Sequence, residues 1–483
     1  MKLNRRGYIA VEIILASIVS ITIAVFLIDI TIRLVNRTDN NYIDTIFVSD
    51  KALLTKNIKE EIENDISNKG VIDSIICSNS NCNIIFNDRS SKELSIEGNK
   101  VTYGSYTKEV DKRLGGVVKV NSSISNDKKY IIINITFTNI FDDSDYSVIV
   151  PISNKKYPPT LAKYITNLYK NASKTTVENN SITYNYAPDE SLMNDRLGGT
   201  TSLDGGNIRY YGASPNNYIY FNCSDYNNQS DTTCEKWRII GVFDGKVKII
   251  RNERIGAYSW DTSTNEWSQA KLMKLLNPGY ESETSGGSLY YNSKSGNCYT
   301  NSSCSTTTCD FTSTGIKNVE TKNRIAEVTW NLGGWSTSQI YSHQIYGYER
   351  GTTVYSGHSR TWPGRIALPY PSDYGYATDF NKCSQNLYNY ESSTNSYGCK
   401  NNDWMYPIIT NSSSNDGWLL TPYSDNNYRA WIVNSSGYVN YSGRNGSNLC
   451  LAYGVAPVLY LSSDESIVEG TTGTESNPFK LNP

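Results

Sequence analysis

The sequence carries little charge and almost no histidine. Only 19% of its 483 residues are charged, and 45 Lys and Arg against 47 Asp and Glu give a formal charge of -2. Because no basic excess is available to hold a phosphate backbone, we expect no nucleic acid among its partners. The two histidines, His343 and His358, are too few for a His-rich zinc site and leave almost nothing for a Ser-His-Asp triad. We therefore predict a protein that is not an enzyme and holds neither a metal nor a cofactor.

What the chain does have is length and many aromatic residues. Its 483 residues are enough for roughly three domains of about 150 residues. Hydrophobic residues make up 38%, and 38 Tyr accompany 34 Gly. This composition is neither that of a disordered chain nor that of a protein with many membrane spans.

A single long apolar run lies near the N-terminus. Residues 8–28 read YIAVEIILASIVSITIAVFLI and follow the basic residues Lys2, Arg5 and Arg6. As a helix this run is about 31 Å long, which is enough to cross a bilayer. No A-x-A-like cleavage site follows it, so an ordinary secretory signal does not account for it. We predict a membrane segment over residues 8–28.

Gly7 and Glu12 narrow the interpretation of this run. The segment RRGYIAVE, with Gly before the apolar run and Glu five residues after it, resembles the processing site of type IV prepilins. The resemblance implies that a membrane prepilin peptidase cuts between Gly7 and Tyr8, and that the new N-terminal residue is methylated. It also implies that Glu12 pairs with the N-terminal amine of a neighbouring subunit, which neutralises both charges in the membrane. Tyr8 stands where the family usually has Phe, and a signal anchor with an unrelated Glu is the alternative.

A long helix and an antiparallel sheet are expected behind the anchor. Leu54, Ile58, Ile62 and Ile66 recur at every fourth position, and a Gly follows as a helix-end signal. Alternating apolar residues then mark strands at 94–96, 101–103, 131–137 and 148–152, the first two joined by a Gly98-Asn99 turn. A helix packed on such a sheet is the globular part of a pilin. We assign residues 1–7 to a leader peptide, 8–68 to the transmembrane and stalk helix, and 69–154 to a pilin-like β domain.

The composition changes again between residues 155 and 206. Two Pro at 158 and 159 open this segment, and Gly pairs at 198 and 205 close it, which is typical of a linker. A short helix over 161–169 is expected within it, with Thr160 as its cap. We assign residues 155–206 to a linker with this helix and 207–483 to a head domain.

The head is predicted to be an α+β domain with many long loops. Asp244-Gly245 between two apolar runs indicates a β-hairpin. Ser263 and Glu266 have the spacing of a capping box before a helix over 267–276. Further helices are expected over 321–330 and 338–348, and late strands over 418–421, 429–433 and 455–461.

Three short runs in the head carry a second resemblance. GRIALPYPSDYGYA at 364–377, GWLLTPYS at 417–424 and YGVAPVLYL at 453–461 are similar to the framework of C-type-lectin-like domains, above all the branch of the formylglycine-generating enzymes. The Glu-Pro-Asn, Gln-Pro-Asp and Trp-Asn-Asp triplets of calcium-dependent lectins do not occur. The reactive Cys pair of the enzymes is missing too, because Cys450 has Cys399 as its nearest preceding cysteine. Neither calcium-mediated sugar binding nor oxidase activity is expected, and a generic β-rich surface domain is the alternative.

Ten cysteines are distributed over the chain. They are Cys77, Cys82, Cys223, Cys234, Cys298, Cys304, Cys309, Cys383, Cys399 and Cys450. None forms the C-x-x-C knuckle of a zinc site, and export would place them in an oxidising compartment, so we expect disulfides. Local spacing favours Cys77 with Cys82, Cys223 with Cys234, and Cys383 with Cys399. The other four have no assigned partner.

The segment 423–448 is rich in residues that are typical of recognition surfaces. Tyr offers rigid amphipathic area, while Asn and Ser offer adaptable hydrogen bonds, a mixture that also suits a neutral glycan. The ligand-binding candidates are Tyr423, Asp425, Asn426, Asn427, Tyr428, Asn434, Tyr438, Asn440, Tyr441, Arg444 and Asn445. Tyr and Asn are abundant throughout the head, so a purely structural role for these residues stays open.

These features predict an α+β protein with a membrane and stalk helix, a small pilin-like sheet and a disulfide-bonded lectin-like head. We expect an exported type IV pilin-like subunit, minor or at the tip, whose head binds a glycan or a surface protein in adhesion. Its partners would be prepilin peptidase, other pilin subunits and the membrane. It would lie in the inner or cytoplasmic membrane before assembly and at the cell surface or in a pilus afterwards, with an extracellular head. The alternatives are a structural pseudopilin of a secretion or DNA-uptake machine, and a surface enzyme built on acids such as Asp373, Asp379 or Asp403.

Overall fold

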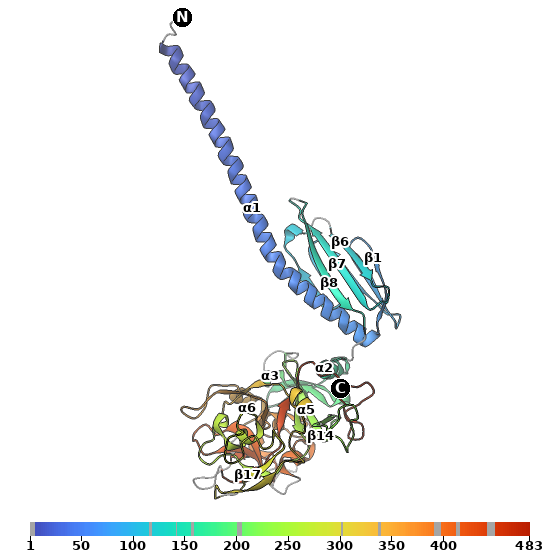
Figure 1. The fold of residues 1–483 in the computed structure, drawn as a ribbon, viewed down its shortest axis with the longest axis vertical. Coiled ribbons are helices and arrows are strands. Elements are labelled where there is room, and N and C mark those ends of the chain that lie inside the picture. The colour runs from blue at the N-terminus through green and yellow to red at the C-terminus, as the bar shows by residue number, and fades with distance from the viewer. Residues whose placement is uncertain are drawn as a thin grey trace. The chain divides into compact units, whose positions relative to one another are not determined.

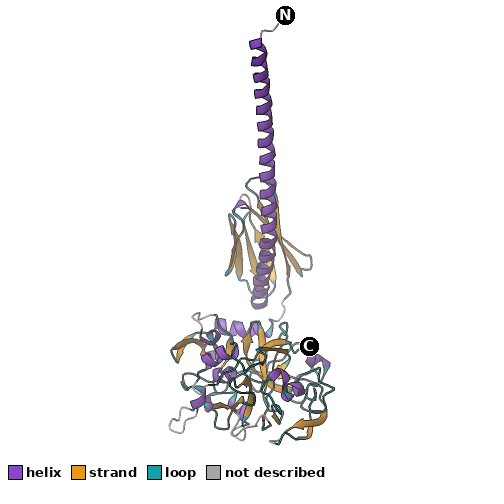
Figure 2. Cartoon of the chain, turned by 90° about the vertical axis from the view of Figure 1, so that its left-hand side faces the viewer, coloured by secondary structure: helices purple, strands orange, loops and turns teal. Residues whose placement is uncertain are grey.

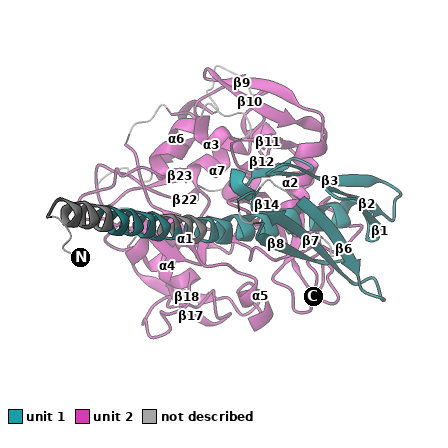
Figure 3. Cartoon of the chain, turned by 90° about the horizontal axis from the view of Figure 1, so that it is seen from above, with its two compact units in different colours: residues 1–157 teal, residues 158–483 magenta. Residues whose placement is uncertain are grey.

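The computed structural model divides the chain into two compact units, Met1–Tyr157 and Pro158–Pro483 (Figure 3). It describes residues 5–114, 118–141, 143–155, 159–199, 205–300, 303–336, 340–390, 398–411, 416–441 and 450–483. Within the first helix, the side chains of residues 5–16, 32 and 34–41 are not described. Both units combine helices with sheets (Figure 2), which confirms the α+β class.

Unit 1 consists of one long helix followed by two antiparallel sheets (Figure 1). The helix is α1 (Arg5–Lys69), and a short 3-10 turn, η1 (Lys112–Leu114), separates the two sheets along the chain. The first sheet holds β1 (Ile72–Cys77), β2 (Asn81–Phe86), β3 (Ser91–Glu97), β4 (Lys100–Tyr103) and β5 (Tyr106–Glu109), each paired with the next. The second holds β6 (Val118–Ile124), β7 (Tyr130–Thr138) and β8 (Asp145–Ser153).

The C-terminal half of α1 packs on these sheets through the stripe seen in the sequence. Leu54, Ile58 and Ile62 are completely buried, and Ile66 is nearly so. They share one core with apolar residues of β4, β7 and β8. The expected turn between β3 and β4 is also present, with Gly98 at a φ of +59°. The prediction of a helix on a small antiparallel sheet is confirmed.

Polar contacts fix the rotation of α1 on the sheets. The Asp65 carboxylate accepts hydrogen bonds from Lys92 Nζ and from the Tyr103 hydroxyl, each at 2.8 Å. Nearer the middle of the helix, Asp50 pairs with Lys108 at 2.8 Å. Because these carboxylates lie beside the apolar stripe, only one face of the helix satisfies both the core and the charges.

The part of α1 before the sheets presents apolar side chains to solvent. Eight large apolar residues between Ile18 and Ile28 are each 52 to 64% exposed. Residues 8–16 of the expected membrane segment lie outside the side chains that the structure describes. Across the described residues, we find no helix that combines the length and the apolarity needed to cross a membrane.

Unit 2 is built around one large antiparallel sheet. Its strands follow the order β21-β26-β15-β14-β12-β11-β10-β9, and β13 also pairs with β14. They are β9 (Thr175–Asn179), β10 (Ile182–Ala187), β11 (Leu192–Asn194), β12 (Ile208–Tyr210), β13 (Tyr218–Phe221), β14 (Glu235–Phe243), β15 (Lys246–Arg251), β21 (Ile366–Ala367) and β26 (Val458–Tyr460). The sheet therefore joins both ends of the unit.

Residues 155–206, which we expected to form a linker, contribute three strands to this sheet. They contain α2 (Leu161–Asn171), η2 (Pro188–Glu190), α3 (Arg196–Gly199) and three strands of the sheet, β9 to β11. Leu161, Ile165 and Tyr169 of α2 pack into the core of unit 2, and Thr160 accepts the expected cap hydrogen bond from Lys163 N. Pro and Gly content indicated a linker, but the apolar residues that alternate along β10 need burial and find it in the sheet.

Smaller elements surround the large sheet. A second sheet has the order β16-β25-β22-β23-β24, and two further hairpins pair β17 with β18 and β19 with β20. The strands are β16 (Ala257–Ser259), β17 (Ser295–Tyr299), β18 (Thr306–Asp310), β19 (Val328–Asn331), β20 (Thr361–Gly364), β22 (Gly417–Pro422), β23 (Ala430–Val433), β24 (Val439–Tyr441) and β25 (Ala452–Gly454). The helices are α4 (Lys271–Leu276), α5 (Val319–Asn323), α6 (Ser342–Glu349), α7 (Pro371–Tyr376) and α8 (Tyr406–Thr410), with 3-10 turns η3 (Trp267–Gln269), η4 (Leu387–Asn389) and η5 (Lys400–Asn402).

Local signals in the head predicted some elements well and others poorly. The Asp244-Gly245 hairpin joins β14 to β15, with both turn residues at positive φ. The helix expected over 321–330 is confirmed only at its start and is wrong from residue 324 on, because α5 ends at Asn323 and β19 begins at Val328. The Ser263-Glu266 capping box does not form; instead Asp261 Oδ2 accepts a hydrogen bond from Lys271 N at the start of α4.

All ten cysteines form disulfides. The three expected local pairs, Cys77–Cys82, Cys223–Cys234 and Cys383–Cys399, are confirmed. The remaining four form Cys298–Cys309 and Cys304–Cys450. Because such bonds persist only in oxidising compartments, the protein is extracellular or periplasmic.

Candidate ligand-binding site

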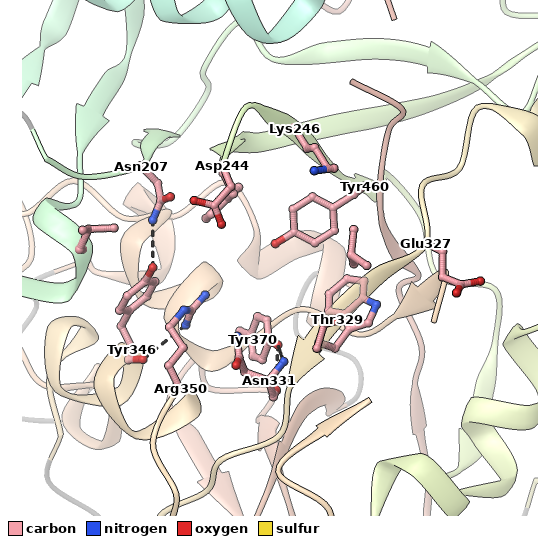
Figure 4. Close-up of a pocket in the computed structure, with 14 residues that line it drawn as sticks. Asn207, Asp244, Lys246, Glu327, Thr329, Asn331, Tyr346, Arg350, Tyr370 and Tyr460 are labelled. Atoms are coloured by element: carbon pink, nitrogen blue, oxygen red, sulfur yellow. Dashed lines mark hydrogen bonds between the residues drawn. The ribbon is translucent and has the colours of Figure 1, made fainter. Parts of the chain in front are cut away.

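A pocket of about 580 Å³ lies in unit 2, where elements far apart in the sequence meet (Figure 4). The β14–β15 hairpin supplies Phe243, Asp244 and Lys246, and β26 supplies Tyr460. Residues 327–331, on and just before β19, also line it, as do Leu197, Asn207, Tyr346, Arg350 and Tyr370. This volume is in the range of sites for small molecules.

A buried lysine lies beneath the aromatic residues of the pocket. Lys248 Nζ is 4.4 Å from the ring centre of Tyr370 and 5.4 Å from those of Trp330 and Phe243. Its distance to the ring of Tyr460 is 5.6 Å. All four rings line the pocket, whereas Lys248 is completely buried, so its ammonium group meets the rings from the core side. The aromatic floor is therefore already occupied by a cation on its inner face.

Lys248 belongs to a chain of four buried charges. Arg209 donates from Nε to Asp195 Oδ2 at 2.6 Å and from Nη1 to Asp373 Oδ1 at 3.0 Å. Lys248 Nζ donates to the other oxygen of Asp373. The four side chains are at most 1% exposed, and two positive charges balance two negative ones. Because neither cation can reach water, Asp373 is the link that holds both in place.

Burial shifts the pKa values of Lys248 and Asp373 in this group of buried charges. Removal of Lys248 from water lowers its pKa to about 8, although the neighbouring Asp373 opposes the shift. For Asp373, burial alone would raise the pKa, but Lys248 and Arg209 outweigh it and hold the pKa below its ordinary value. Both members of the pair are thus charged at neutral pH.

Arg350, unlike Lys248, lines the pocket itself. Its side chain is 24% exposed, and its guanidinium carbon lies 3.5 Å from the ring centre of Tyr346 and 5.3 Å from that of Tyr370. Nη1 donates to Glu349 Oε2 at 3.0 Å and to the Tyr346 carbonyl at 3.3 Å. Burial would lower the pKa of Arg350, but the Glu349 carboxylate together with Tyr346 and Tyr370 outweighs it and raises the pKa, so the guanidinium stays charged. Among the described residues, no acceptor reaches Nε or Nη2.

Other polar groups of the pocket are also available for hydrogen bonds to a ligand. Among the described residues, the Tyr460 hydroxyl and the side-chain amide of Asn331 have no hydrogen-bond partner. Asp244 and Lys246 stand at the hairpin tip, and Glu327 lies across the pocket from them (Figure 4). The wall thus offers donors and acceptors of both signs above an aromatic floor.

The ligand-binding candidates from the sequence lie elsewhere, on and between β22, β23 and β24. Tyr423 is buried and packs against Trp431 and Tyr441, with ring centres 5.6 and 5.0 Å apart. Buried Asn265 holds the loop between β22 and β23: its Nδ2 donates to the carbonyls of Tyr423, Asn426 and Arg429 at 2.7 to 2.9 Å. Part of the expected recognition surface therefore serves packing.

The remaining candidates divide by exposure. Asp425 and Tyr428 are exposed, and Asn426, Asn427, Asn434, Tyr438, Asn440 and Tyr441 are partly buried. Asn434 Oδ1 accepts hydrogen bonds from Ser436 N and Tyr438 N and so closes its own turn. Arg444 and Asn445 lie outside the described residues. The described candidates do not line the pocket, so the two candidate surfaces share no residue.

The other expected site residues show no catalytic grouping. Gly7, Tyr8 and Glu12 fall within α1, but their side chains are outside the description. In the described part of the chain, no three His, Cys, Asp or Glu side chains gather as metal ligands. Asp373 and Asp403 are buried, and neither they nor Asp379 line the pocket.

Sequence reasoning missed the residues that build the pocket. One signal was present: Lys248 interrupts an apolar strand, KVKII, where only a buried partner explains a charge. Its partner Asp373 lies 125 residues away, and no local pattern connects the two. No family model, curated protein or solved structure matches this chain.

Proposed function

We propose that the chain is an exported type IV pilin-like subunit, minor or at the tip, whose unit 2 is a lectin-like head that binds a surface ligand. In this proposal α1 serves membrane insertion and assembly, and unit 2 serves recognition. The type IV prepilin resemblance of RRGYIAVE supports the first part, and the pocket supports the second.

The observation that carries the proposal is the contrast within α1. Residues 54–66 bury their apolar stripe on the sheets of unit 1, whereas Ile18 to Ile28 expose large apolar side chains on every side of the helix. Exposed Phe26, for example, leaves 62% of its surface in water. A helix that is apolar all round needs lipid or other helices around it, since each buried Å² of apolar area contributes about 25 cal/mol. Such burial is what a bilayer or a bundle of identical helices provides.

Glu12 gives this proposal its specific chemistry. A carboxylate inside an apolar helix is costly to bury unless a cation neutralises it. Cleavage after Gly7 would create an amine at Tyr8 on each subunit, and the amine of one subunit would neutralise Glu12 of its neighbour. The same pair would set the register between neighbouring helices.

The pocket favours recognition over a purely structural head. Open donors and acceptors above aromatic rings are typical of sites that bind small molecules or sugars. A structural pseudopilin of a secretion or DNA-uptake machine remains the second candidate, and it gives the pocket no role. The two candidate functions differ in the ligand of the head: a surface ligand in adhesion, and other subunits in a pseudopilin.

The first test is the mass of the protein sheared from the surface of its native cells. We expect a chain that starts at Tyr8, with or without a methyl group, and contains no free thiol. Glu12→Gln should reduce surface assembly by about tenfold or more, because a buried amine would lose its only counter-charge. Glu60→Gln, at an exposed position of the same helix, is the matched control and should assemble normally.

Two results would contradict this proposal. A chain that still starts at Met1 and stays in the membrane fraction would exclude assembly through a processed N-terminus. A chain that assembles but whose unit 2 binds only other pilus subunits, and neither glycans nor host proteins, would replace adhesion by the pseudopilin role.

A further inference from the structure

We infer that the pocket of unit 2 binds a carboxylated sugar, with the carboxylate held by Arg350 and the sugar ring above the aromatic floor. This assignment names a ligand class for the proposed head and rests on that proposal. It also places the site at the β14–β15 hairpin rather than on the 423–448 segment.

Arg350 is prepared for an anion. One of its terminal nitrogens, Nη1, is held by Glu349 and by the Tyr346 carbonyl, which fixes the plane of the guanidinium. The rings of Tyr346 and Tyr370 flank it at 3.5 and 5.3 Å. Nε and Nη2 then remain as two adjacent donors on one edge, the spacing that a carboxylate accepts in a bidentate pair. Figure 4 shows the guanidinium and the Tyr460 hydroxyl directed toward the space between the lining residues.

The cations on the inner side of the floor weaken its attraction for a cationic ligand. Aromatic rings attract a cation through the negative charge on their faces. Here Lys248 already lies against four of the rings from the core side, and Arg209 lies 4.5 Å from the ring centre of Phe243. A second cation on the pocket side would be attracted less strongly, because Lys248 and Arg209 already polarise the ring electrons toward the core. Oxygen-rich ligands avoid this penalty.

The wall above the floor suits a polyhydroxylated ring better than a peptide. Asn331 and Thr329 offer groups that both donate and accept hydrogen bonds, and Asp244 and Lys246 add one acceptor and one donor at the rim. A peptide side chain would need a dry apolar recess, whereas the hydroxyls of a sugar can pair with each of these groups. The volume of about 580 Å³ holds one or two sugar rings.

The test compares two sugars that differ only at the position Arg350 is expected to read. Methyl glucuronoside and methyl glucoside share one ring and differ by a carboxylate against a hydroxymethyl group. With the full-length chain in detergent micelles and isothermal titration calorimetry, we expect the glucuronoside to bind about tenfold tighter or more, because charge-assisted bidentate pairs are the strong ones. Added salt should reduce the difference in affinity between the two sugars, because it screens the charge on Arg350.

Variants separate Arg350 from general effects. Arg350→Gln should remove the difference between the two sugars, and Arg350→Lys should keep only part of it, because lysine lacks the two-pronged geometry. Arg360→Gln, an exposed arginine away from the pocket, is the matched control and should change nothing. Tyr460→Phe keeps the ring and should weaken both sugars by a similar factor of about three to ten. Thermal unfolding of each variant shows whether the fold is intact.

The remaining outcomes overturn specific parts of the inference. Equal affinity for glucuronoside and glucoside would exclude recognition of the carboxylate. N-acetylalanine binding as tightly as the glucuronoside would exclude the sugar, and tighter binding of choline than of either sugar would exclude the charge argument. If neither sugar binds, the pocket is not a sugar site, while processing at Gly7 and assembly through α1 are decided separately by the surface mass measurement.

Discussion

The two units solve the problem of burying a core in different ways. The core of unit 1 is mainly aliphatic, with Ile and Leu from α1 facing Ile, Val and Leu from two regular sheets. Unit 2 contains all nine Trp of the chain, eight of them among its most deeply buried side chains. It also holds four of the five disulfides and the chain of buried charges. Regular elements pack well with branched aliphatic residues, whereas many loops need large rings and cross-links to fill the space between them.

The connections along the chain follow the same division. In the first sheet of unit 1, every strand pairs with its neighbour in sequence. In unit 2, β15 pairs with β26, so residues near 249 meet residues near 459. Strand pairing in the first sheet of unit 1 is therefore local, whereas the large sheet of unit 2 depends on contacts that close long stretches of chain.

Removing one disulfide from each unit should give the largest difference. Cys304–Cys450 closes a separation of 146 residues, whereas Cys77–Cys82 closes only 5. On the chain-entropy account, the double change Cys304→Ser with Cys450→Ser should cost about 5 kcal/mol, and Cys77→Ser with Cys82→Ser about 2 kcal/mol. Urea unfolding followed by Trp fluorescence reports unit 2, because unit 1 has no Trp.

The companion signal for unit 1 is far-UV circular dichroism at 222 nm, dominated there by α1. If the two double variants lose equal stability, the length of the closed loop does not determine how much each disulfide stabilises its unit. A loss confined to the Trp signal in the Cys304 and Cys450 variant is the expected pattern.

Breaking the buried charge chain should be the next largest effect. Asp373→Asn leaves Lys248 without a counter-charge and weakens the hold on Arg209, and we expect unit 2 to lose about 4 kcal/mol at pH 7. Urea unfolding with Trp fluorescence measures the loss. Adding Lys248→Met should restore much of it, because the double variant no longer buries an unpaired ammonium group.

Unit 1 offers a matched control for this prediction. Asp65→Asn also removes a carboxylate from a lysine, but Lys92 is 26% exposed and can turn to water. Its loss should stay near 1 kcal/mol. An equal loss for Asp65→Asn and Asp373→Asn would mean that burial does not set the strength of these pairs.

The fold of unit 1 and some local elements of unit 2 could be predicted from the sequence. The stripe from Leu54 to Ile66, the turn at Gly98, the hairpin at Asp244 and the three closely spaced disulfides each depend on residues that are near one another. In each case, the physical cause acts within one or two elements. Such short-range patterns can be recognised in a single sequence.

The pocket could not be predicted, because its parts are distant in the chain. Lys248, Asp373 and Arg209 come from β15, α7 and β12, and only the folded sheet brings them together. The segment 423–448 looked like a recognition surface because composition does not reveal burial. Tyr423, for example, is only 9% exposed. A charge inside an apolar strand, as at Lys248, is the signal that deserved more weight.

A buried acid gives unit 2 a pH dependence that unit 1 should lack. Asp403 accepts a hydrogen bond from the Tyr390 hydroxyl at 2.7 Å, has no cationic partner among the described residues, and burial raises its pKa to about 8. A carboxyl group with a raised pKa stabilises the fold fully below its ordinary pKa of 3.8, and this stabilisation is lost as the pH rises toward 8. Asp403→Asn stays neutral, so it should match the native chain near pH 4 and become the more stable of the two as the pH rises, by up to about 1.4 kcal/mol for each pH unit between 3.8 and 8.

Thermal unfolding at several pH values, followed by Trp fluorescence, measures this difference. A gap between native and Asp403→Asn chains that does not change with pH would show that the carboxyl group is ionised throughout. The 222 nm signal of unit 1 should not respond to the substitution.

The smallest expected effects come from helix ends, with one in each unit. Thr160 Oγ1 accepts a hydrogen bond from Lys163 N at 3.3 Å and caps α2, so Thr160→Ala should cost unit 2 about 1 kcal/mol. Gly70 follows α1 at a φ of +92°, and Gly70→Ala should cost unit 1 about 1 kcal/mol, because a side chain disfavours that conformation. The first change should move the Trp transition and leave the α1 part of the 222 nm signal in place, and the second should move the α1 part of the 222 nm signal and leave the Trp transition in place. If either change moves both signals equally, the units unfold as one body, and the contrast between their cores does not extend to their stability.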